Sequence, residues 1–380
     1  MPAPHMKIEH INLREVRMSL KAPFETSFGV IQDRRIPLVE VIADGVSGWG
    51  EVTTGETPAY NAETTDTAWH VISDFIAPLV IGKELGDATG LEGLLSGIRG
   101  HAMAKAGVEN ALWDIEAQQK EMPLAKLLCG TREEIACGVS LGIREDPKML
   151  VEAVEKELAC GYQRIKLKIK PGKDIDYVAA VRERFPSIQL SVDANSAYSL
   201  DDSWRLKELD NFRLLMIEQP LGWDDIYAHS KLQARLSTAI CLDECINNVS
   251  QAAAAIEVKA CRIINVKLGR VGGHNGARKV HDVCLQHSVP VWCGGMLESG
   301  IGRAHNIAMS TLPNFSLPGD VSASRRYWHE DIVEPEIEVT PRGTISVPRT
   351  AGLGYGTRRD LIERLTSRKK SWKATVTVSV

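Results

Sequence analysis

Five charged residues recur at nearly constant spacing in the second half of the sequence, each at the end of a short apolar run. They are Lys168, Asp193, Glu218, Asp243 and Lys267, and consecutive members are separated by 25, 25, 25 and 24 positions. Three clustered carboxylates without a compensating charge would repel one another and be forced to take up protons. Carboxylate oxygens are the ligands that Mg²⁺ accepts in near-octahedral sites. The spacing therefore predicts a site for Mg²⁺, replaceable by Mn²⁺ or Co²⁺, rather than salt bridges to the two lysines alone.

The flanking lysines predict acid–base chemistry beside that metal. A free lysine has a pKa of about 10.4, and burial near other cations would lower it towards the range of about 7–8 that suits a general base. Lys166 lies on the same face of "RIKLKI" as Lys168 and would supply part of that neighbouring charge. Lys170, beyond the expected strand end, is expected to be solvated. Lys168 and Lys267 on opposite sides of one substrate carbon would remove a proton from one face and deliver one to the other.

Parallel strands are needed to bring these residues together. From about residue 135 onward, short apolar runs alternate with helical patterns: "IACGVSLGI", "RIKLKI", "IQLSVDAN", "FRLLMIEQP", "AICLDE", "RIINVKLG", "PVWCGG" and "FSLPGD". Eight such runs predict an α/β fold, a modified TIM barrel of the (β/α)7β type, because the last connection is short and irregular. Both faces of a barrel strand are covered, so we expect the lysines of the second strand at the open C-terminal rim.

The rest of the sequence divides the chain into three parts. Residues 1–128 contain two strand-like runs and then helical patterns, which predict an α+β domain. Residues 129–320 form the barrel, and residues 321–380 return to the first domain as strands and turns. Between the first two strand-like runs lies "KAPFETSFGV", a flap-like loop. The basic tail "TSRKKSWKATVTVSV" receives no assignment.

Composition excludes several classes of protein. The 380 residues carry a formal net charge of −4, without a basic stripe, so we expect no nucleic-acid partner. No apolar run approaches the roughly 18 residues of a membrane helix, and the first residues lack the layout of a signal peptide. The eight cysteines form no CxxC pair, which favours buried, reduced thiols and a cytoplasmic protein. We expect a small-molecule partner and a homo-oligomer.

The sequence resembles the enolase superfamily, muconate-lactonising subgroup. The pair Lys166 and Lys168, the three acidic residues and Lys267 carry this resemblance over nearly the whole chain. The segments "CGVSLGI", "VDANSAY", "IEQPL", "VKLGRVGG", "WCGGMLESGIGRAHN" and "LPGDVSAS" are more specifically similar to the o-succinylbenzoate synthase / N-succinylamino acid racemase family. Members of that superfamily use a lysine or histidine base with Mg²⁺ that stabilises an ene-diolate, and the resemblance implies the same chemistry here.

The resemblance implies a role for each matching residue. Lys168 and Lys267 would be the acid–base pair, and the acidic triad would bind the metal below an α+β capping domain. Further implied site residues are Asn195 and Glu244 beside the metal ligands, Arg270 near Lys267, Ser140, Gly295 and Met296 facing the substrate, and Phe24, Thr26 and Phe28 in the flap. A structural ion pair is the alternative for Arg270, and simple packing is the alternative for Ser140, Gly295 and Met296.

The implied activity is abstraction of a proton α to a carboxylate, as N-acylamino acid racemase, o-succinylbenzoate synthase, or both. Muconate cycloisomerase and dipeptide epimerase are alternatives within the superfamily. An aldolase that forms a Schiff base on the lysine of the sixth strand is an alternative from another class, which the carboxylate triad disfavours. A non-catalytic binding protein is the remaining alternative, and the presence of all five charged residues argues against it.

Overall fold

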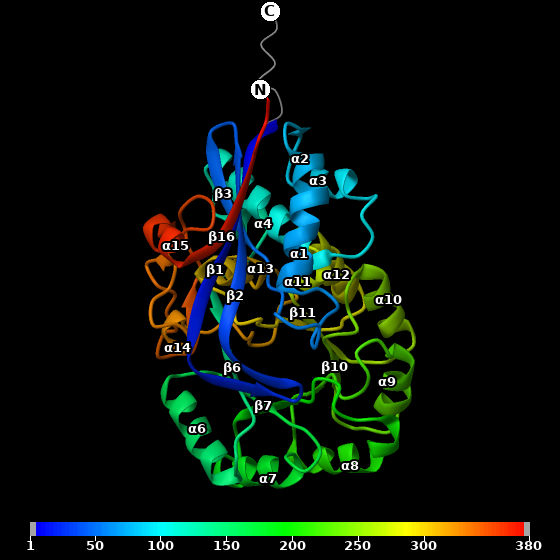
Figure 1. The fold of residues 1–380 in the computed structure, drawn as a ribbon. Helices are drawn as coiled ribbons and strands as arrows, with labels where there is room; N and C mark the ends of the chain where they lie inside the picture. Colours follow the sequence, from blue (N-terminus) through cyan, green and yellow to red (C-terminus); the bar gives the residue numbers. More distant parts are fainter. Residues whose placement is uncertain (1–4, 376–380) are drawn as a thin grey trace, which may run out of the picture.

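An antiparallel sheet forms one end of the molecule in the computed structural model, which describes residues 5–375 (Figure 1). Its strand order is β16-β1-β2-β3, with β1 (Met6–Thr26), β2 (Gly29–Ala43), β3 (Val46–Glu51) and β16 (Thr366–Lys373). β1 begins with alternating buried apolar side chains, as expected for a sheet with one face on the core. The pairing of β16 with β1 gives part of the basic tail a place in this sheet, and residues 376–380 lie outside the described part of the chain.

Helix α4 (Ala102–Gln119) is buried on almost every side between this sheet and the barrel. Its buried acidic side chains bind backbone N–H groups of other segments. The Glu109 carboxylate accepts from His274 N (2.8 Å) and Asn275 N (2.9 Å), and Asp114 accepts from Trp49 N (3.0 Å). Such bonds offset the cost of burying charged groups. The remaining elements of this region are β4 (Glu84–Leu85), α1 (Thr65–Val71), a π-helical turn (Ile72–Ile76), α2 (Ala77–Val80), α3 (Gly90–Leu94) and α5 (Leu124–Leu127).

Seven parallel strands form the second sheet, in the order β12-β11-β10-β9-β8-β7-β6. They are β6 (Gly138–Leu141), β7 (Arg164–Lys168), β8 (Gln189–Asp193), β9 (Ile217–Glu218), β10 (Ile240–Leu242), β11 (Ile263–Val266) and β12 (Val291–Cys293). The expected eighth strand closes the barrel through single parallel bridges, Phe315 to Val291 on one side and Gly319 to Cys137 on the other. The α/β barrel fold is therefore confirmed.

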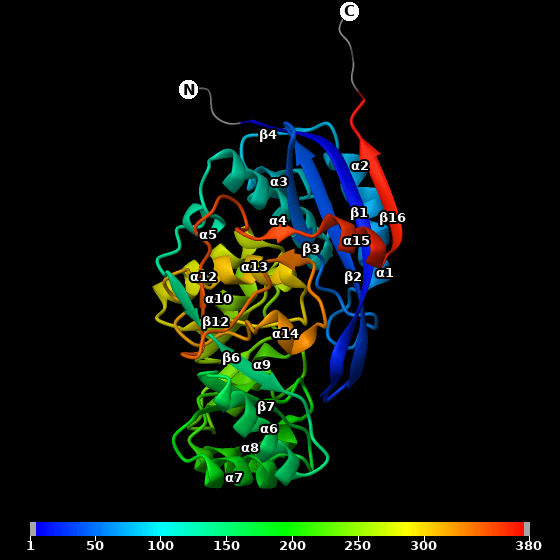
Figure 2. The ribbon, with the colours of Figure 1, turned by 90° about the vertical axis from the view of Figure 1, so that its left-hand side faces the viewer.

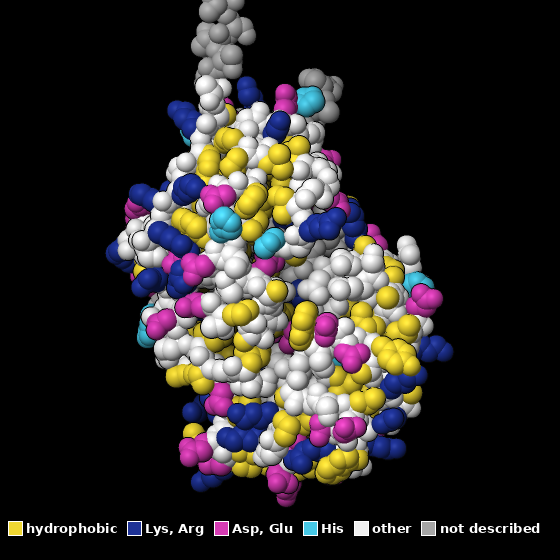
Figure 3. Space-filling model, turned by 45° about the vertical axis from the view of Figure 1, so that its right-hand side comes forward, with side chains coloured by type: hydrophobic (Ala, Val, Ile, Leu, Met, Phe, Trp, Pro, Cys, Tyr) yellow, Lys and Arg dark blue, Asp and Glu magenta, His cyan; other side chains and the backbone are white. Residues whose placement is uncertain are grey.

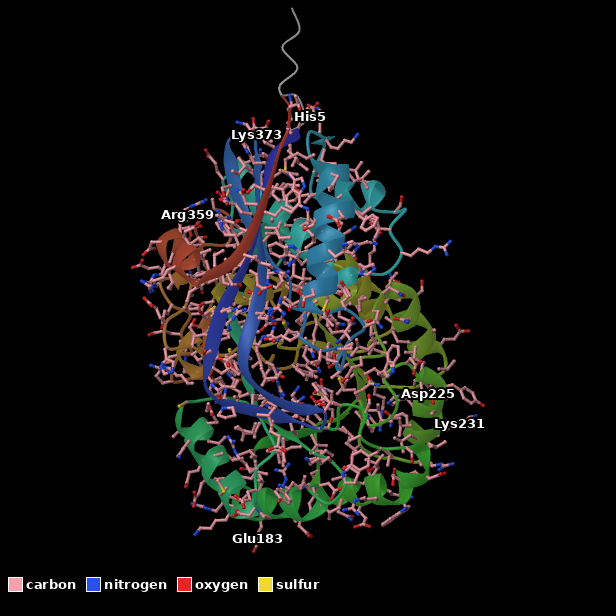
Figure 4. The ribbon with its side chains drawn as sticks, viewed as in Figure 1. His5, Glu183, Asp225, Lys231, Arg359 and Lys373 are labelled. Carbon is pink, nitrogen blue, oxygen red and sulfur yellow. The ribbon has the colours of Figure 1, made fainter. Side chains whose placement is uncertain are left out.

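Helices cover the outside of these strands (Figures 1 and 2). They are α6 (Pro147–Ala159), α7 (Ile175–Arg184), α8 (Ser203–Glu208), α9 (Ile226–Gln233), α10 (Val249–Glu257), α12 (His274–Gln286) and α13 (Gly300–Met309), while the short α11 (Leu268–Val271) packs against α4 of the capping region. After the eighth strand comes the four-residue α14 (Ser324–Tyr327), so the last barrel helix is reduced, as expected. Side chains of Glu183 on α7 and Lys231 on α9 lie on the outer surface of this ring (Figure 4).

Two buried carboxylates of the capping region hold the two domains together. Glu51 at the end of β3 accepts from Ser299 N (3.1 Å) and Gly302 N (3.0 Å) at the start of α13. Glu109 binds the start of α12 in the same way. A helix N-terminus offers free N–H groups and a partial positive charge to such an anion. Burial nevertheless raises the pKa of Glu51 to about 8 and that of Glu109 to about 7.

Some local expectations were wrong. The run "IACGVSLGI" forms two strands, since β5 (Glu134–Ala136) pairs antiparallel with β14 (Thr344–Ser346) before β6 enters the barrel. Cys129 and Cys160 are exposed, although all eight cysteines are free. The chain between the barrel and β16 also contains β13 (Val333–Glu334), β15 (Gly356–Thr357) and α15 (Arg359–Leu365). The domain limits at residues 128 and 320 stay a prediction.

The face of the molecule shown in Figure 3 has no simple charge pattern. Lysine and arginine side chains are interspersed with acidic ones over the face shown in Figure 3. Among residues 5–375, no helix combines the length and the apolar character needed to cross a membrane.

Candidate active site

The five regularly spaced residues lie at the carboxyl ends of five neighbouring strands. Lys168, Asp193 and Glu218 are the last residues of β7, β8 and β9, while Asp243 and Lys267 directly follow β10 and β11. The strand register pairs Lys168 with Asp193 and Asp193 with Glu218. The constant sequence interval therefore corresponds to one βα unit, which brings these residues to one edge of the barrel.

Each of the three carboxylates is bound to a lysine ammonium group. Lys168 Nζ lies 2.6 Å from Asp193 Oδ2, Lys166 Nζ lies 2.8 Å from Glu218 Oε2, and Lys267 Nζ lies 2.8 Å from Asp243 Oδ2. Within the described residues, no three His, Cys, Asp or Glu side chains converge as a ready-made metal ligand set. The ion pairs that we set aside as the alternative are thus present.

The donor set still fits a hard divalent cation. Carboxylates from three adjacent strand ends supply oxygen ligands of the kind that Mg²⁺ accepts. Next to them, Glu244 Oε2 is buried without a hydrogen-bond partner in the described structure, while Glu244 Oε1 accepts from Asn195 Nδ2 at 2.8 Å. Asn195 also donates its backbone N–H to Asp193 Oδ1 (3.0 Å). These contacts place Asn195 and Glu244 where they would orient metal ligands.

The pKa values reflect crowding of negative charge. Burial would raise the pKa of Asp193, but the ammonium groups of Lys168 and Lys166 hold it well below its usual range. Burial and the charge of Asp193 raise the pKa of Glu218. Burial, again with the charge of Asp193, raises the pKa of Glu244 to about 7. The group thus contains more carboxylates than it can keep fully ionised without further positive charge.

Lys166 lies deeper in the barrel than we expected. It is only 3% exposed, and its ammonium group contacts Asp193 (3.1 Å), Glu218 (2.8 Å) and Asp320 (2.7 Å). Its Nζ also lies 4.8 Å from the centroid of the Trp292 ring. The expectation that both lysines of the second strand lie at the rim was therefore wrong for Lys166. Asp320 was missed, although it is the last residue of the expected eighth strand "FSLPGD", where the strand-end rule would have found it.

Without a bound cation, the pKa of Lys267 is raised, whereas the lowering that we expected depended on a metal beside it. Burial alone would lower its pKa, but Tyr60, Glu218 and Glu244 raise it above the ordinary value. The expected shift required surrounding cations, whereas the groups that face Lys267 in this chain are largely acidic. Its Nζ lies 4.3 Å from the centroid of the Tyr60 ring. Tyr60 lies in the loop after β3, and no local pattern in the sequence distinguished it.

Arg270 is fully engaged in hydrogen bonds beside Lys267. Its guanidinium donates to Ile246 O (2.7 Å), to the Tyr60 hydroxyl (2.8 Å) and to the carboxylate of Asp243. The Tyr60 hydroxyl donates in turn to Asp243 Oδ1 (3.0 Å). Asp243 is therefore shared between Arg270 and Lys267, and the ion-pair interpretation of Arg270 accounts for its contacts.

A cavity of about 420 Å³ opens above these residues, between the β1–β2 hairpin and the barrel. The expected site residues that line it are Lys168, Lys267, Asn195, Gly295, Met296, Phe24, Thr26 and Phe28. Tyr60 also lines it, whereas Ser140 does not. Ser140 is buried on β6 in register with Lys166, and its hydroxyl has no hydrogen-bond partner among the described residues.

The expected flap forms the tip of a strand hairpin. Phe24 and Thr26 pair with Ile31 and Gly29 at the tip of β1 and β2, which extends over the barrel in Figures 1 and 2. Three contacts hold this tip to the barrel: Ser27 Oγ to Asn195 O (3.1 Å), Ile143 N to Glu25 O (3.1 Å), and the Lys170–Glu25 ion pair (3.3 Å). Lys170 is thus half-buried in this contact, and the expectation that it is solvated was wrong.

Comparison with known proteins identifies the family. Residues 8–129 match the mandelate racemase / muconate lactonizing enzyme N-terminal domain, and residues 149–361 match the enolase C-terminal domain-like family. The chain belongs to the enolase superfamily. A solved structure of an enolase superfamily member from Listeria innocua has a TM-score of 0.94 and 40% identity, covering 97% of this chain and 99% of that chain.

Two named relatives represent the two expected groups. The o-succinylbenzoate synthase of Geobacillus kaustophilus is 49% identical over 98% of this chain and 99% of its own length. The N-succinylamino acid racemase of Amycolatopsis is 45% identical over 96% of this chain and 99% of its own length. The resemblance to this family is therefore confirmed. A dipeptide epimerase from Cytophaga hutchinsonii, solved with Mg and a dipeptide, is 27% identical with a TM-score of 0.89, covering 96% of this chain and 100% of its own.

Proposed function

We propose that this protein uses Mg²⁺ to remove the proton α to a carboxylate, as N-succinylamino acid racemase, o-succinylbenzoate synthase, or both. The observation that carries the proposal is the placement of Lys168 and Lys267 around one cavity. The two lysines come from β7 and β11, which lie four strands apart in the barrel. They would therefore approach a bound substrate from opposite sides, with the three carboxylates between them.

Asp193, Glu218 and Asp243 would hold Mg²⁺, and Mn²⁺ or Co²⁺ would be acceptable replacements because the ligands are oxygen atoms. When bound, the cation would supply positive charge to the substrate carboxylate as negative charge develops on its oxygens. Added positive charge would also draw Asp193 and Asp243 away from their lysine partners. The ammonium groups of Lys168 and Lys267 would then be released towards the substrate.

The lysines would divide the proton transfers between them. In racemisation, the unprotonated amine of one lysine takes the α-proton, and the ammonium group of the other protonates the opposite face of the planar intermediate. In the synthase reaction, the amine of Lys168 would take the α-proton and, as an ammonium group, return a proton to the departing hydroxyl group, which leaves as water. Lys267 would remain protonated beside the developing negative charge. Lys166 and Arg270 would keep the carboxylates in place, and Phe24, Thr26 and Phe28 would exclude water from the cavity.

Several wider expectations belong to the same proposal. We infer that the protein is a cytoplasmic homo-oligomer without nucleic-acid partners, with a capping domain over residues 1–128 and a barrel over residues 129–320. The substrate is a small-molecule carboxylate. Muconate cycloisomerase and dipeptide epimerase activity remain the alternatives within the superfamily, and the identities of 49% and 45% to the synthase and the racemase favour the proposed pair.

Two parallel assays test the proposal. The loss of optical rotation of N-succinyl-L-phenylalanine measures racemisation, and the appearance of aromatic absorbance from the hydroxylated precursor measures o-succinylbenzoate formation. Turnover in at least one assay is expected, and a muconate or dipeptide substrate that turns over in place of both would contradict the proposal. Borohydride with a carbonyl substrate tests the aldolase alternative, and we expect no covalent trapping on Lys267.

A further inference from the structure

A buried arginine lines the substrate cavity on the side of the capping domain. Arg34 lies on β2, where it pairs with Met18 of β1, and it is 3% exposed. It borders the same cavity as Lys168 and Lys267. Among the described residues that line this cavity, it is the only arginine. A third cationic side chain therefore faces the space in which a substrate would lie.

Most of the hydrogen-bonding capacity of Arg34 is unused. A guanidinium carries five N–H donors. In the described part of the chain, Arg34 donates one hydrogen bond, from Nη2 to Thr54 O at 3.1 Å, and its Nε is buried without a partner. By contrast, its chain neighbour Arg35 forms paired bonds to both Glu15 and Asp66 on the other side of the strand. An unsatisfied buried donor is costly, so a ligand that accepts from it gains binding free energy.

Arg34 also forms no ion pair with a carboxylate among the described residues. Burial lowers its pKa, which the charges of Glu51, Glu298 and Glu56 partly offset, but none of these accepts a hydrogen bond from it in the described structure. The Glu51 carboxyl is occupied by Ser299 and Gly302. A buried cation without an ion-pair partner is poised for an anion from the cavity.

We propose that Arg34 binds the second carboxylate of a dicarboxylate substrate, the one distant from the reacting carbon. This inference rests on the proposed function, in which the first carboxylate lies at the strand-end triad. The names of both groups of relatives contain a succinyl group, which carries such a second carboxylate. Arginine suits this role because its planar fork matches a carboxylate. Arg34 would therefore select succinyl over uncharged acyl groups.

Equilibrium binding separates this inference from the catalytic proposal. Calorimetry with Mg²⁺ measures the Kd values of two ligands, N-succinyl-L-phenylalanine and N-butanoyl-L-phenylalanine. The two acyl groups have a similar length, but the butanoyl group lacks the second carboxylate. The proteins are the wild type, Arg34→Met, Arg34→Lys and the matched control Arg35→Met, which removes the ion pairs of Arg35 to Glu15 and Asp66. Circular dichroism and binding of the N-butanoyl ligand report whether each variant is folded, and Arg34→Gln replaces an insoluble Arg34→Met.

The wild type and Arg35→Met are expected to bind the succinyl ligand about 10- to 100-fold more tightly than the butanoyl ligand. Arg34→Met should bind both ligands alike, with little change for the butanoyl ligand, and Arg34→Lys should retain part of the preference. The inference would be overturned if the wild type bound the two ligands equally or bound neither. It would also be overturned if Arg34→Met kept the wild-type preference, or if Arg34→Met bound both ligands more weakly by the same factor. Loss of preference in Arg34→Met without any turnover by the wild type would instead reject the proposed function and leave the carboxylate site standing.

Discussion

Lys267 lies directly against Gly294, and the contact leaves no room for a side chain at that glycine. A Cβ atom at position 294 would lie 2.6 Å from Lys267 Cε and would also meet the Asn265 side chain, closer than real Cβ contacts occur. Gly294 follows β12, and its N–H binds Val266 O at 3.1 Å, so the backbone there cannot move freely. The position of this lysine is therefore fixed by the neighbouring strand end.

The substitution Gly294→Ala tests this contact. Because the methyl group must displace the Asn265 side chain and Lys267, kcat should fall by about 100-fold or more, as when a reacting group is misplaced by about 1 Å. Steady-state kinetics with the active substrate measure the effect, and Gly97→Ala is the control, since a Cβ there meets nothing within 4 Å. Equal kcat values for the two variants would show that Lys267 is not held in this way.

If Lys168 and Lys267 act on opposite faces of the substrate, loss of one lysine should stop racemisation but leave exchange of the α-proton in one enantiomer. Lys267→Ala should abolish racemisation, by about 100-fold or more, because no group remains to protonate the second face. It should preserve exchange of the α-proton in the enantiomer that faces Lys168. Proton NMR in D₂O with each enantiomer measures this separation. Wild-type exchange rates for both enantiomers would show that the assignment is wrong.

Lys166 should be important for stability as well as for the site. Lys166→Met leaves Asp193, Glu218 and Asp320 without the ammonium group that contacts all three. Removing one member of a buried ion cluster typically costs about 3–5 kcal/mol. Urea unfolding should show this loss, whereas Lys170→Met removes a half-exposed pair and should cost at most about 1 kcal/mol. Similar losses in the two variants would contradict the buried-cluster interpretation.

The raised pKa of Glu51 predicts that the free energy of unfolding decreases as the pH rises. Its pKa rises from 4.5 to about 8 on folding, so between these values the folded protein holds a proton that the unfolded chain has released. The contribution of Glu51 to the free energy of unfolding is therefore greatest below pH 4.5. It decreases by at most about 1.4 kcal/mol per pH unit between pH 4.5 and about 8, and it does not decrease further above pH 8. Glu51→Gln should lack this fall. The free energy of unfolding is measured at pH 5.5 and 7.5 for the wild type and for Glu51→Gln. An equal change between the two pH values in both proteins would contradict this role of Glu51.

The barrel and the residues at its strand ends could be predicted from the sequence because both follow from the repeat of the βα unit. Each βα unit returns the chain to the same edge of the sheet, so a charge repeated at that interval must converge in space. Lys168, Asp193 and Glu218 illustrate this, since the strand register aligns them directly.

Other features could not be predicted from the sequence because they depend on tertiary contacts. Tyr60 and Arg34 reach the cavity from the capping domain, and nothing in their local pattern specifies which barrel residues they meet. The direction of the Lys267 pKa shift depends on the balance between burial and facing acidic groups, which spacing does not give. Lys170 became half-buried only because the hairpin brings Glu25 against it.

Proton exchange in D₂O tests the central claim, a metal-dependent site with two lysines. N-succinyl-L-phenylalanine and N-succinyl-D-phenylalanine are incubated separately with the protein, with Mg²⁺ and again with EDTA, and the α-proton signal is followed by NMR. We expect loss of the signal for both enantiomers with Mg²⁺ and its retention with EDTA. Exchange that survives EDTA, or no exchange with either enantiomer in Mg²⁺, would contradict it.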